Sequence, residues 1–200
     1  VFRQKNGHIC AASNSALELA TREWVALLDH DDILAEHALY CVADTVMKHP
    51  EAGLVYSDED KIDKNGERSS PYFKCDWNPD LFRSHNMISH LGVYRRLLVT
   101  KVGGFREGLE GSQDYDLAFR CIECLDSTQI IHIPRVLYHW RIHEKSAASV
   151  ANEKPYAQEA AIRAIREHLM RTGVPGDVEM TPFFQYRIRY AIPEPHPLVS

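Results

Sequence analysis

The sequence lacks several features that would assign it to a familiar class of protein. It contains no uninterrupted apolar run of about 18 residues, so no segment is expected to span a membrane. It has no basic excess, because 23 Lys and Arg stand against 28 Asp and Glu for a net charge of −5. The basic residues are also scattered, so a nucleic-acid binder that relies on a basic face is not expected.

Cysteine is scarce as well. The five cysteines form an odd set, and Cys121 and Cys124 are the only closely spaced pair. No second pair completes a zinc site, and we interpret these two as packed thiols in a helix of a protein from a reducing compartment. The chain has neither a signal peptide nor an initiator Met, so we expect it to be an excerpt of a longer protein. Its 200 residues, 44% of them hydrophobic, suffice for one full core.

The stretch of residues 24–32 is the most informative part of the chain. Five apolar residues run directly into Asp29-His30-Asp31-Asp32, which predicts a buried strand that ends abruptly in charge. In an open α/β sheet, ligands bind at the carboxyl ends of the strands. Carboxylates this close repel one another, and a divalent cation is the usual reason to collect them. A helix cap needs only one Asp, so the pattern favours a metal site, with which capping by Asp32 is compatible.

A second predicted strand, residues 53–56, also runs into acidic residues, at positions 57–60. A predicted helix over residues 35–49 separates the two strands and stops at Pro50. The order strand, helix, strand predicts a βαβ unit with parallel strands, which should bring both acidic ends to one edge of the sheet.

Further elements are predicted around this unit. Hydrophobic periodicity predicts helices over residues 11–20, 95–102, 113–124 and 155–171, and strands over residues 87–94, 129–133, 135–142 and 183–190.

Two further groups of residues could carry chemistry. Asp114 lies in the first turn of a predicted helix after a Gly-rich loop. Its carboxylate could simply stabilise the positive N-terminal end of the helix, or it could accept a proton from a bound hydroxyl. His139, Arg141 and His143 fall on one side of a predicted strand, with Lys145 after them. They could bind a metal and phosphate oxygens, or form a polar face on an edge strand. A metal site, a base and a phosphate-binding segment together indicate group transfer from an activated donor.

Isolated histidines are interpreted as structural, and His90 is one of them.

Several motifs in the same order resemble those of inverting family 2 glycosyltransferases with the GT-A fold. The resemblance covers residues 3–150 and rests on Asn6-Gly7-x-x-x-Ala11-x-x-Asn14, the apolar strand into Asp29-His30-Asp31-Asp32, Gly103-Gly104-Phe105, Gln113-Asp114-Tyr115-Asp116 and Tyr138-His139-Trp140-Arg141-x-His143. It implies an α/β fold of three layers around a mostly parallel mixed sheet, without the first βαβ portion. Residues 1–150 would be a partial transferase domain, residues 151–190 an extension of a helix and a strand, and residues 191–200 a Pro-rich linker into a tandem transferase module.

The resemblance also implies roles for individual residues. Asp114 matches the catalytic base, and Gln113 stands before it where the family often has Glu. Asp31 and His143 match ligands of Mn²⁺ or Mg²⁺, with His139 as the other candidate for the histidine ligand. The residues implied at the donor are Asn14, Asp29, Asp32, Arg141 and Lys145, and those implied at the acceptor are Trp77, Gln113 and Tyr115.

The implied activity is metal-dependent transfer of a sugar, with inversion, from a nucleotide-sugar donor to a glycan or lipid-linked acceptor. Its setting would be bacterial surface polysaccharide or O-antigen synthesis in the cytoplasm, with peripheral association of the full-length protein at the inner face of the membrane. The chain as given could be inactive alone.

Two alternatives stay open. A metal-dependent phosphoesterase would need more His and Asp ligands at strand ends. A non-catalytic sugar-binding fragment would use Trp77, Trp140 and Tyr115 for stacking, but the presence of Asp31, Asp114 and His143 argues against it.

Overall fold

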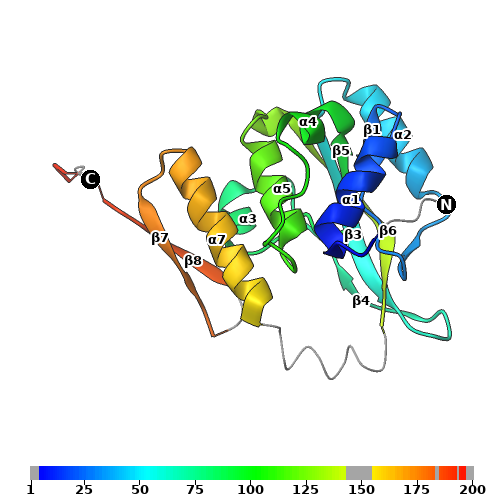
Figure 1. The fold of residues 1–200 in the computed structure, drawn as a ribbon. Coiled ribbons are helices and arrows are strands. Elements are labelled where there is room, and N and C mark those ends of the chain that lie inside the picture. The colour runs from blue at the N-terminus through cyan, green and yellow to red at the C-terminus, as the bar shows by residue number, and fades with distance from the viewer. Residues whose placement is uncertain (1–4, 143–154, 183–184, 193, 197–200) are drawn as a thin grey trace.

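The computed structural model describes residues 5–142, 155–182, 185–192 and 194–196 (Figure 1). The described elements are α1 (His8–Leu19), β1 (Trp24–Ala26), β2 (Ile33–Leu34), α2 (Ala38–Lys48), β3 (Leu54–Ile62), β4 (Arg68–Tyr72), α3 (Pro79–Ser84), β5 (Gly92–Arg95), α4 (Arg96–Lys101), α5 (Gln113–Ile122), the 3-10 turn η1 (Ser127–Gln129), β6 (Ile130–Arg141), α7 (Pro155–Arg171), β7 (Gly176–Met180) and β8 (Tyr186–Tyr190). The structure confirms every predicted helix to within a few residues. The sequence patterns missed β2, β4, α3 and β7.

A sheet of six strands forms the centre of the molecule. Its order is β1-β5-β3-β6-β2, with β4 paired to β3. Among the described strands of this sheet, β3 and β6 run parallel and all other pairs are antiparallel. The predicted α/β class with a mixed sheet is confirmed, but the prediction of a mostly parallel sheet is wrong. The reason is that β5 lies between β1 and β3, so these two strands point the same way without being neighbours.

The strand β3 continues through the acidic residues that were expected to follow it. Its partner β6 runs beside it from the pair Leu54–Ile130 to the pair Ile62–Arg141, so residues 57–60 lie inside the sheet. The prediction of a second acidic strand end is therefore wrong. Pro134 also does not divide β6, because the register shifts there and the strand absorbs it as a bulge.

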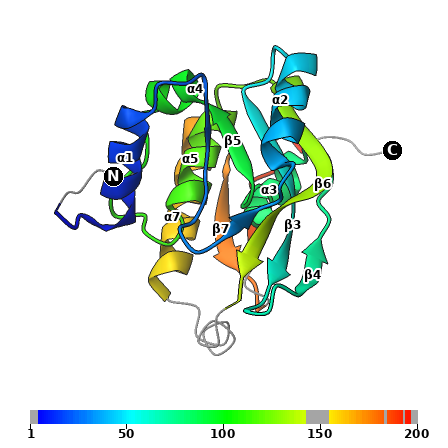
Figure 2. The ribbon, with the colours of Figure 1, turned by 90° about the vertical axis from the view of Figure 1, so that its right-hand side faces the viewer.

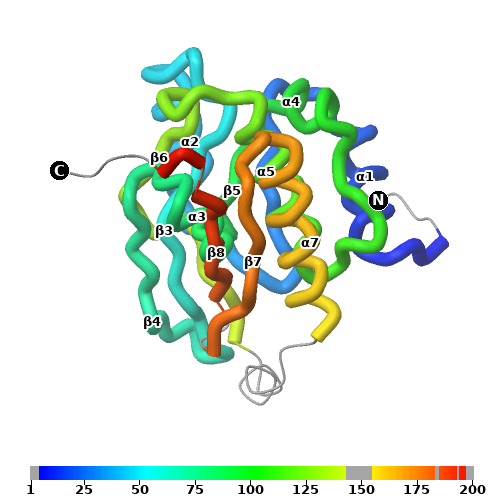
Figure 3. The backbone as a smooth tube through the Cα atoms, turned by 90° about the vertical axis from the view of Figure 1, so that its left-hand side faces the viewer, coloured from blue at the N-terminus to red at the C-terminus, as the bar shows by residue number. Residues whose placement is uncertain are grey.

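Successive residues of the central strands face two separate cores. Leu54 and Tyr56 pack into a core with α1, α4, α5 and α7, whereas Val55 packs against α2 on the opposite face. Figure 2 shows α1, α4 and α5 on one side of the sheet and α2 on the other. Farther from the sheet, α7 packs on α5 and the β7–β8 hairpin packs on α7, with α3 beside β8 (Figure 3).

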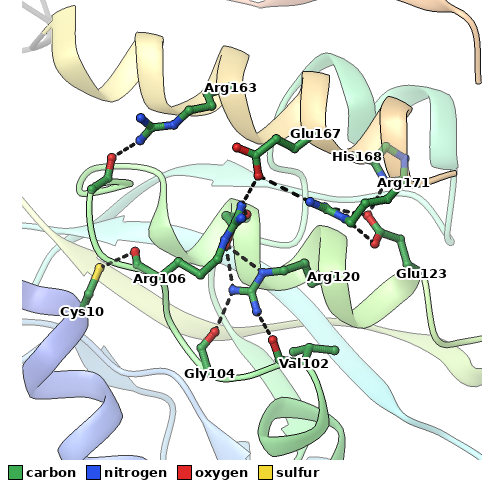
Figure 4. Close-up of polar contacts among 12 residues, drawn as sticks. Cys10, Val102, Gly104, Arg106, Arg120, Glu123, Arg163, Glu167, His168 and Arg171 are labelled. Carbon is green, nitrogen blue, oxygen red and sulfur yellow. Dashed lines mark hydrogen bonds and ion pairs between the residues drawn. The ribbon is translucent and has the colours of Figure 1, made fainter. Parts of the chain in front are cut away.

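An ion-pair network fastens α7 to α5. Asp116 is fully buried and accepts hydrogen bonds from Arg120 Nε at 2.9 Å and from Arg106 Nε at 3.0 Å. The same Arg106 reaches Glu167 of α7 at 2.6 Å (Figure 4). Because Asp116 belongs to the first turn of α5, the network fixes this end of the helix as well as α7.

A second contact between the two helices centres on Glu123. It accepts hydrogen bonds from His168 Nδ1 at 2.8 Å and Arg171 Nε at 2.7 Å. Burial alone would raise the pKa of Glu123, but these two partners lower it below its ordinary value.

The five cysteines are all free. Cys121 is buried and Cys124 is exposed, so the prediction of packed thiols holds for Cys121 only. Within the described residues, no helix has both the length and the apolar character to cross a membrane.

Candidate active site

A cavity of about 510 Å³ lies between α1, β1 and the first turn of α5. Most of its wall is apolar and comes from α1 and from residues 25–28. The polar part of the lining comes from several segments of the chain: Ser13, Asp29, Ser89, His90, Gln113 and Asp114. Such a mixture of an apolar wall with a few convergent polar groups is typical of a ligand site.

The acidic loop after β1 is held by the end of β6. Asp29 N donates to Tyr138 Oη at 3.2 Å, and Tyr138 Oη donates to Asp32 Oδ2 at 2.5 Å. Arg141 contributes two further bonds, from its backbone N to Asp32 Oδ1 at 2.8 Å and from its Nε to the Asp31 carbonyl at 2.7 Å. Burial and the bond to Asp32 raise the pKa of Tyr138 well above its usual range, so this hydroxyl stays a donor. The loop therefore has a defined shape.

Three side chains of this region could hold a metal ion. Among the described residues, Asp29, Asp32 and His90 each offer a ligand atom, and these atoms lie within 4.8 Å of one another. Two carboxylates and an imidazole suit a divalent cation such as Mn²⁺. Each oxygen of Asp32 accepts one hydrogen bond and keeps a further lone pair, so these residues fit a metal ion.

The ligands implied by the family resemblance differ from this set. Asp31 lies in the same loop, with its carboxylate 3.6 Å from the ring of His30. His143 and Lys145 lie outside the described residues. The other candidate, His139, is buried, and its Nδ1 is bonded to Asp60 at 2.5 Å.

Interpretation of the sequence missed His90. Its ring stacks on Tyr138 with 4.5 Å between centroids and an interplanar angle of 11°. It comes near Asp29 because β5 pairs antiparallel with β1, so the residues before β5 lie beside the residues after β1. No motif marks this position, and only the pairing of β1 with β5 would have indicated it.

Asp114 lies in the first turn of α5 and lines the same cavity. Its Oδ2 accepts a hydrogen bond from Asn86 Nδ2 at 2.8 Å. Burial raises the pKa of Asp114, His90 partly opposes this, and Asp29 adds to the rise. A carboxylate with a raised pKa is a better proton acceptor, which suits a general base. Its neighbour Gln113 accepts a bond from Gly111 N at 2.7 Å and shapes the preceding loop.

Three residues predicted at the donor or acceptor have other contacts in the structure. Asn14 exchanges two hydrogen bonds of 2.8 Å with the backbone of Phe105 and so ties α1 to the loop before α5. Tyr115 is buried in the core, where its hydroxyl donates to the Phe82 carbonyl. Trp77 is partly buried, with its ring centroid 5.2 Å from that of Phe82. None of the three is among the residues that line the cavity.

The two aspartates of β3 are bonded to basic side chains of neighbouring strands. Asp58 Oδ1 lies 2.8 Å from His132 Nε2, and the two oxygens of Asp60 are bonded to His139 Nδ1 at 2.5 Å and Arg68 Nε at 2.6 Å. Both aspartates are buried. Their partners leave them engaged within the sheet rather than available to a ligand.

Comparison with known proteins gives sequence relatives. The family model described as "Glycosyl transferase family 2" matches residues 1–103. The uncharacterized protein y4gI of Sinorhizobium fredii is 51% identical over 100% of this chain and 22% of its own length. The O-antigen biosynthesis protein RfbC of Myxococcus xanthus is 40% identical over 93% of this chain and 14% of its own length. The chain thus spans about a fifth or less of the length of these relatives.

Solved structures match at the level of the fold. Residues 1–349 of TarS from S. aureus cover 96% of this chain, with 78% of that chain matched, a TM-score of 0.52 and 14% identity. The mannosyltransferase PcManGT from Pyrobaculum calidifontis, solved with GDP-Man and Mn²⁺, covers 86% of this chain, with 56% of that chain matched, a TM-score of 0.50 and 17% identity.

Proposed function

The chain belongs to glycosyl transferase family 2 and has the GT-A fold, and from this premise we propose that it carries out sugar transfer. The donor would be a nucleotide-diphosphate sugar, and the acceptor a hydroxyl of a glycan or of a lipid-linked saccharide. A divalent cation would assist, and the anomeric carbon would be inverted. The observation that carries the proposal is the cavity lined by both Asp29 and Asp114, two residues 85 positions apart in the sequence.

Asp114 would act as the general base of the reaction. It would accept the proton of the acceptor hydroxyl while the oxygen attacks the anomeric carbon, which releases the nucleoside diphosphate. Attack in a single displacement inverts the configuration at that carbon. The raised pKa of Asp114 supports this role, and the bond from Asn86 holds the carboxylate in one orientation.

The loop of residues 29–32 would bind the metal ion and the donor. A bound Mn²⁺ or Mg²⁺ supplies positive charge that neutralises the leaving diphosphate. The distances in the structure support Asp29, Asp32 and His90 as ligands, whereas the family resemblance predicts Asp31 and His143. The presence of Mn²⁺ and GDP-Man in PcManGT supports a metal and a nucleotide sugar for this chain also. Arg141, whose guanidinium lies against the loop, and Lys145 would add positive charge for the diphosphate.

The biological setting would be the synthesis of surface polysaccharide, including O-antigen. The relative RfbC, named as an O-antigen biosynthesis protein, supports this setting. A 24% identical relative, the chondroitin synthase of Escherichia coli, is also named for polysaccharide synthesis. The division of the chain after residues 150 and 190 and the tandem module stay predictions.

The test uses the whole protein, incubated with Mn²⁺, a panel of nucleotide sugars and saccharide acceptors. We expect release of nucleoside diphosphate and a loss of that release in the Asp29→Ala and Asp114→Ala variants. Release at the wild-type rate in both variants would contradict the assigned roles. Release of inorganic phosphate would indicate a phosphoesterase, and glycan binding without release would indicate a sugar-binding fragment.

A further inference from the structure

A fully buried lysine lies behind the wall of the cavity. The side chain of Lys74 is 0% exposed, and its ammonium group has three acceptors. Its Nζ donates to Glu59 Oε2 at 3.0 Å, to the Ile88 carbonyl at 2.9 Å and to the His90 carbonyl at 2.6 Å. Two of these three acceptors therefore belong to the backbone of one short turn, residues 88–90.

Glu59, the partner of Lys74 in the ion pair, binds the same turn. Its Oε2 accepts a hydrogen bond from the backbone N of His90 at 3.1 Å. The carbonyl of His90 is thus bonded to the buried Lys74 side chain, and its amide to the partly buried side chain of Glu59. Hydrogen bonds to charged groups are shorter and stronger than those between neutral groups, so the turn is held firmly.

Stability alone does not explain this ion pair. Burial lowers the pKa of Lys74, and Glu59 partly opposes this, which shows that the charge has a desolvation cost. Replacing a buried ion pair by apolar residues of similar volume is often neutral or stabilising in proteins. The structural consequence specific to this pair is the fixed position of the turn of residues 88–90.

That turn carries two of the polar residues that line the cavity, Ser89 and His90. The ring of His90 stacks on Tyr138, whose hydroxyl is bonded to the acidic loop. That bond goes to Asp32, so the turn and the loop both contact the side chain of Tyr138.

We propose that Lys74 and Glu59 are positioning residues that hold His90 against the acidic loop in the geometry that sugar transfer requires. This inference rests on the proposed function, since it gives His90 a place in that site. The pair contacts the backbone of the turn and acts through it, without touching the substrate.

We call the hydrogen bonds that Lys74 and Glu59 make with the turn of residues 88–90 the clamp. The first test measures this clamp independently of activity. In the Lys74→Met variant, amide hydrogen exchange of the peptide covering residues 86–92 should become faster, while exchange in α5 and α7 stays unchanged. Unchanged exchange in residues 86–92 would overturn the inference. If Lys74→Met does not fold, Glu59→Gln removes the charge of the pair and should give a smaller change in the same direction.

The second test asks whether the clamp matters for transfer. Lys74→Met should lower kcat/KM for nucleoside diphosphate release about 10- to 100-fold, the range found for residues that orient metal-ligating residues by hydrogen bonds. His90→Ala should lower it as well. The matched control is Glu123→Gln, a partly buried ion-pair residue between α5 and α7 away from the cavity lining. At a temperature well below unfolding, this control should keep the wild-type kcat/KM.

The outcomes separate the two levels of inference. An equal loss of kcat/KM in Lys74→Met and Glu123→Gln, or full activity of His90→Ala, would overturn the positioning role. If the wild-type protein releases no nucleoside diphosphate, the proposed function fails, and faster exchange in residues 86–92 would still establish the clamp.

Discussion

The acidic loop of residues 29–32 and the acidic part of β3 begin from the same sequence pattern, an apolar strand that runs into aspartates. Their surroundings in the structure are opposite. The loop leaves the sheet after β1, and Asp29 is exposed at the cavity. In β3 the strand continues, and Asp58 and Asp60 are buried. What separates the two is whether neighbouring strands supply basic side chains to the carboxylates.

The strand β6 contacts both acidic stretches, but with different groups. Its His132 and His139 are bonded to Asp58 and Asp60, within the part of β6 that runs beside β3. Toward the loop, β6 offers the neutral hydroxyl of Tyr138 and the backbone N of Arg141 to Asp32, and the guanidinium of Arg141 donates to the backbone carbonyl of Asp31. The loop thus keeps negative charge for a cation, while Asp58 and Asp60 of β3 serve stability. This comparison leads to four predictions.

The largest effect is expected at Asp114, the acid that completes the cavity. Asp114→Asn should lower kcat for nucleoside diphosphate release by about 100- to 10,000-fold, because removal of a general base costs that much. Its free energy of unfolding should not fall, since the neutral amide avoids burying a charge. An unchanged kcat in this variant would show that Asp114 is not the general base.

A large effect on stability is expected within β3. Asp60→Asn should lower the free energy of unfolding by about 3 kcal/mol, because it leaves His139 and Arg68 without their carboxylate. The matched change Asp29→Asn in the exposed loop should cost less than about 0.5 kcal/mol. Urea denaturation of the two variants measures both values. Equal losses would mean that the two acidic stretches do not differ as the structure indicates.

Mn²⁺ binding should depend on the site at the acidic loop and not on the acidic residues of β3. At a Mn²⁺ concentration about 100 times its Kd, the free energy of unfolding should rise by about 2.7 kcal/mol. Asp60→Asn should keep this increment and His90→Ala should lose most of it, as thermal unfolding with and without Mn²⁺ will show. If His90→Ala keeps the increment and Asp31→Ala loses it, the ligands are those implied by the family resemblance.

The smallest effect concerns pH. Because burial raises the pKa of Asp114, kcat/KM should fall on acidification at a pH above about 3.9, the ordinary pKa of Asp. Stability follows the opposite direction. A raised pKa favours the neutral form in the folded state. The wild type should therefore lose stability relative to Asp114→Asn as pH rises from the ordinary pKa of Asp through the raised pKa of Asp114 in the folded protein. An acid limb at the ordinary pKa would show that burial does not act on this carboxylate.

Local patterns predicted every described α-helix except α3, because each of the predicted helices has its own periodicity and stop signal. Pro155–Arg171 and Gln113–Ile122 begin at the predicted residues. The strands were harder to interpret, since pairing decides where they end. β3 extends to Ile62 because β6 and β4 pair with it on its two sides, and Pro134 is accommodated by a shift in register.

The candidate site was predicted in part. The acidic loop and Asp114 were recognised as chemical groups from residue type and position, and the cavity brings them together. Tyr115 and Trp77 look like sugar-stacking aromatic residues in the sequence, but they pack in or against the core. His90 could not be recognised, because its neighbours come from β1 and β6, distant in the chain.

The amino-acid sequence specifies the chemical groups: a loop of aspartates after an apolar strand, an aspartate at the start of a helix, and the motifs of a transferase family. The tertiary structure alone decided which of these charges stay available. An aspartate in a strand and an aspartate in a loop have the same side chain, and their charge depends on the partners that strand pairing brings within hydrogen-bonding distance. That pairing joins residues far apart in the chain, and it gave Asp60 a histidine and an arginine but placed Asp29 beside a cavity.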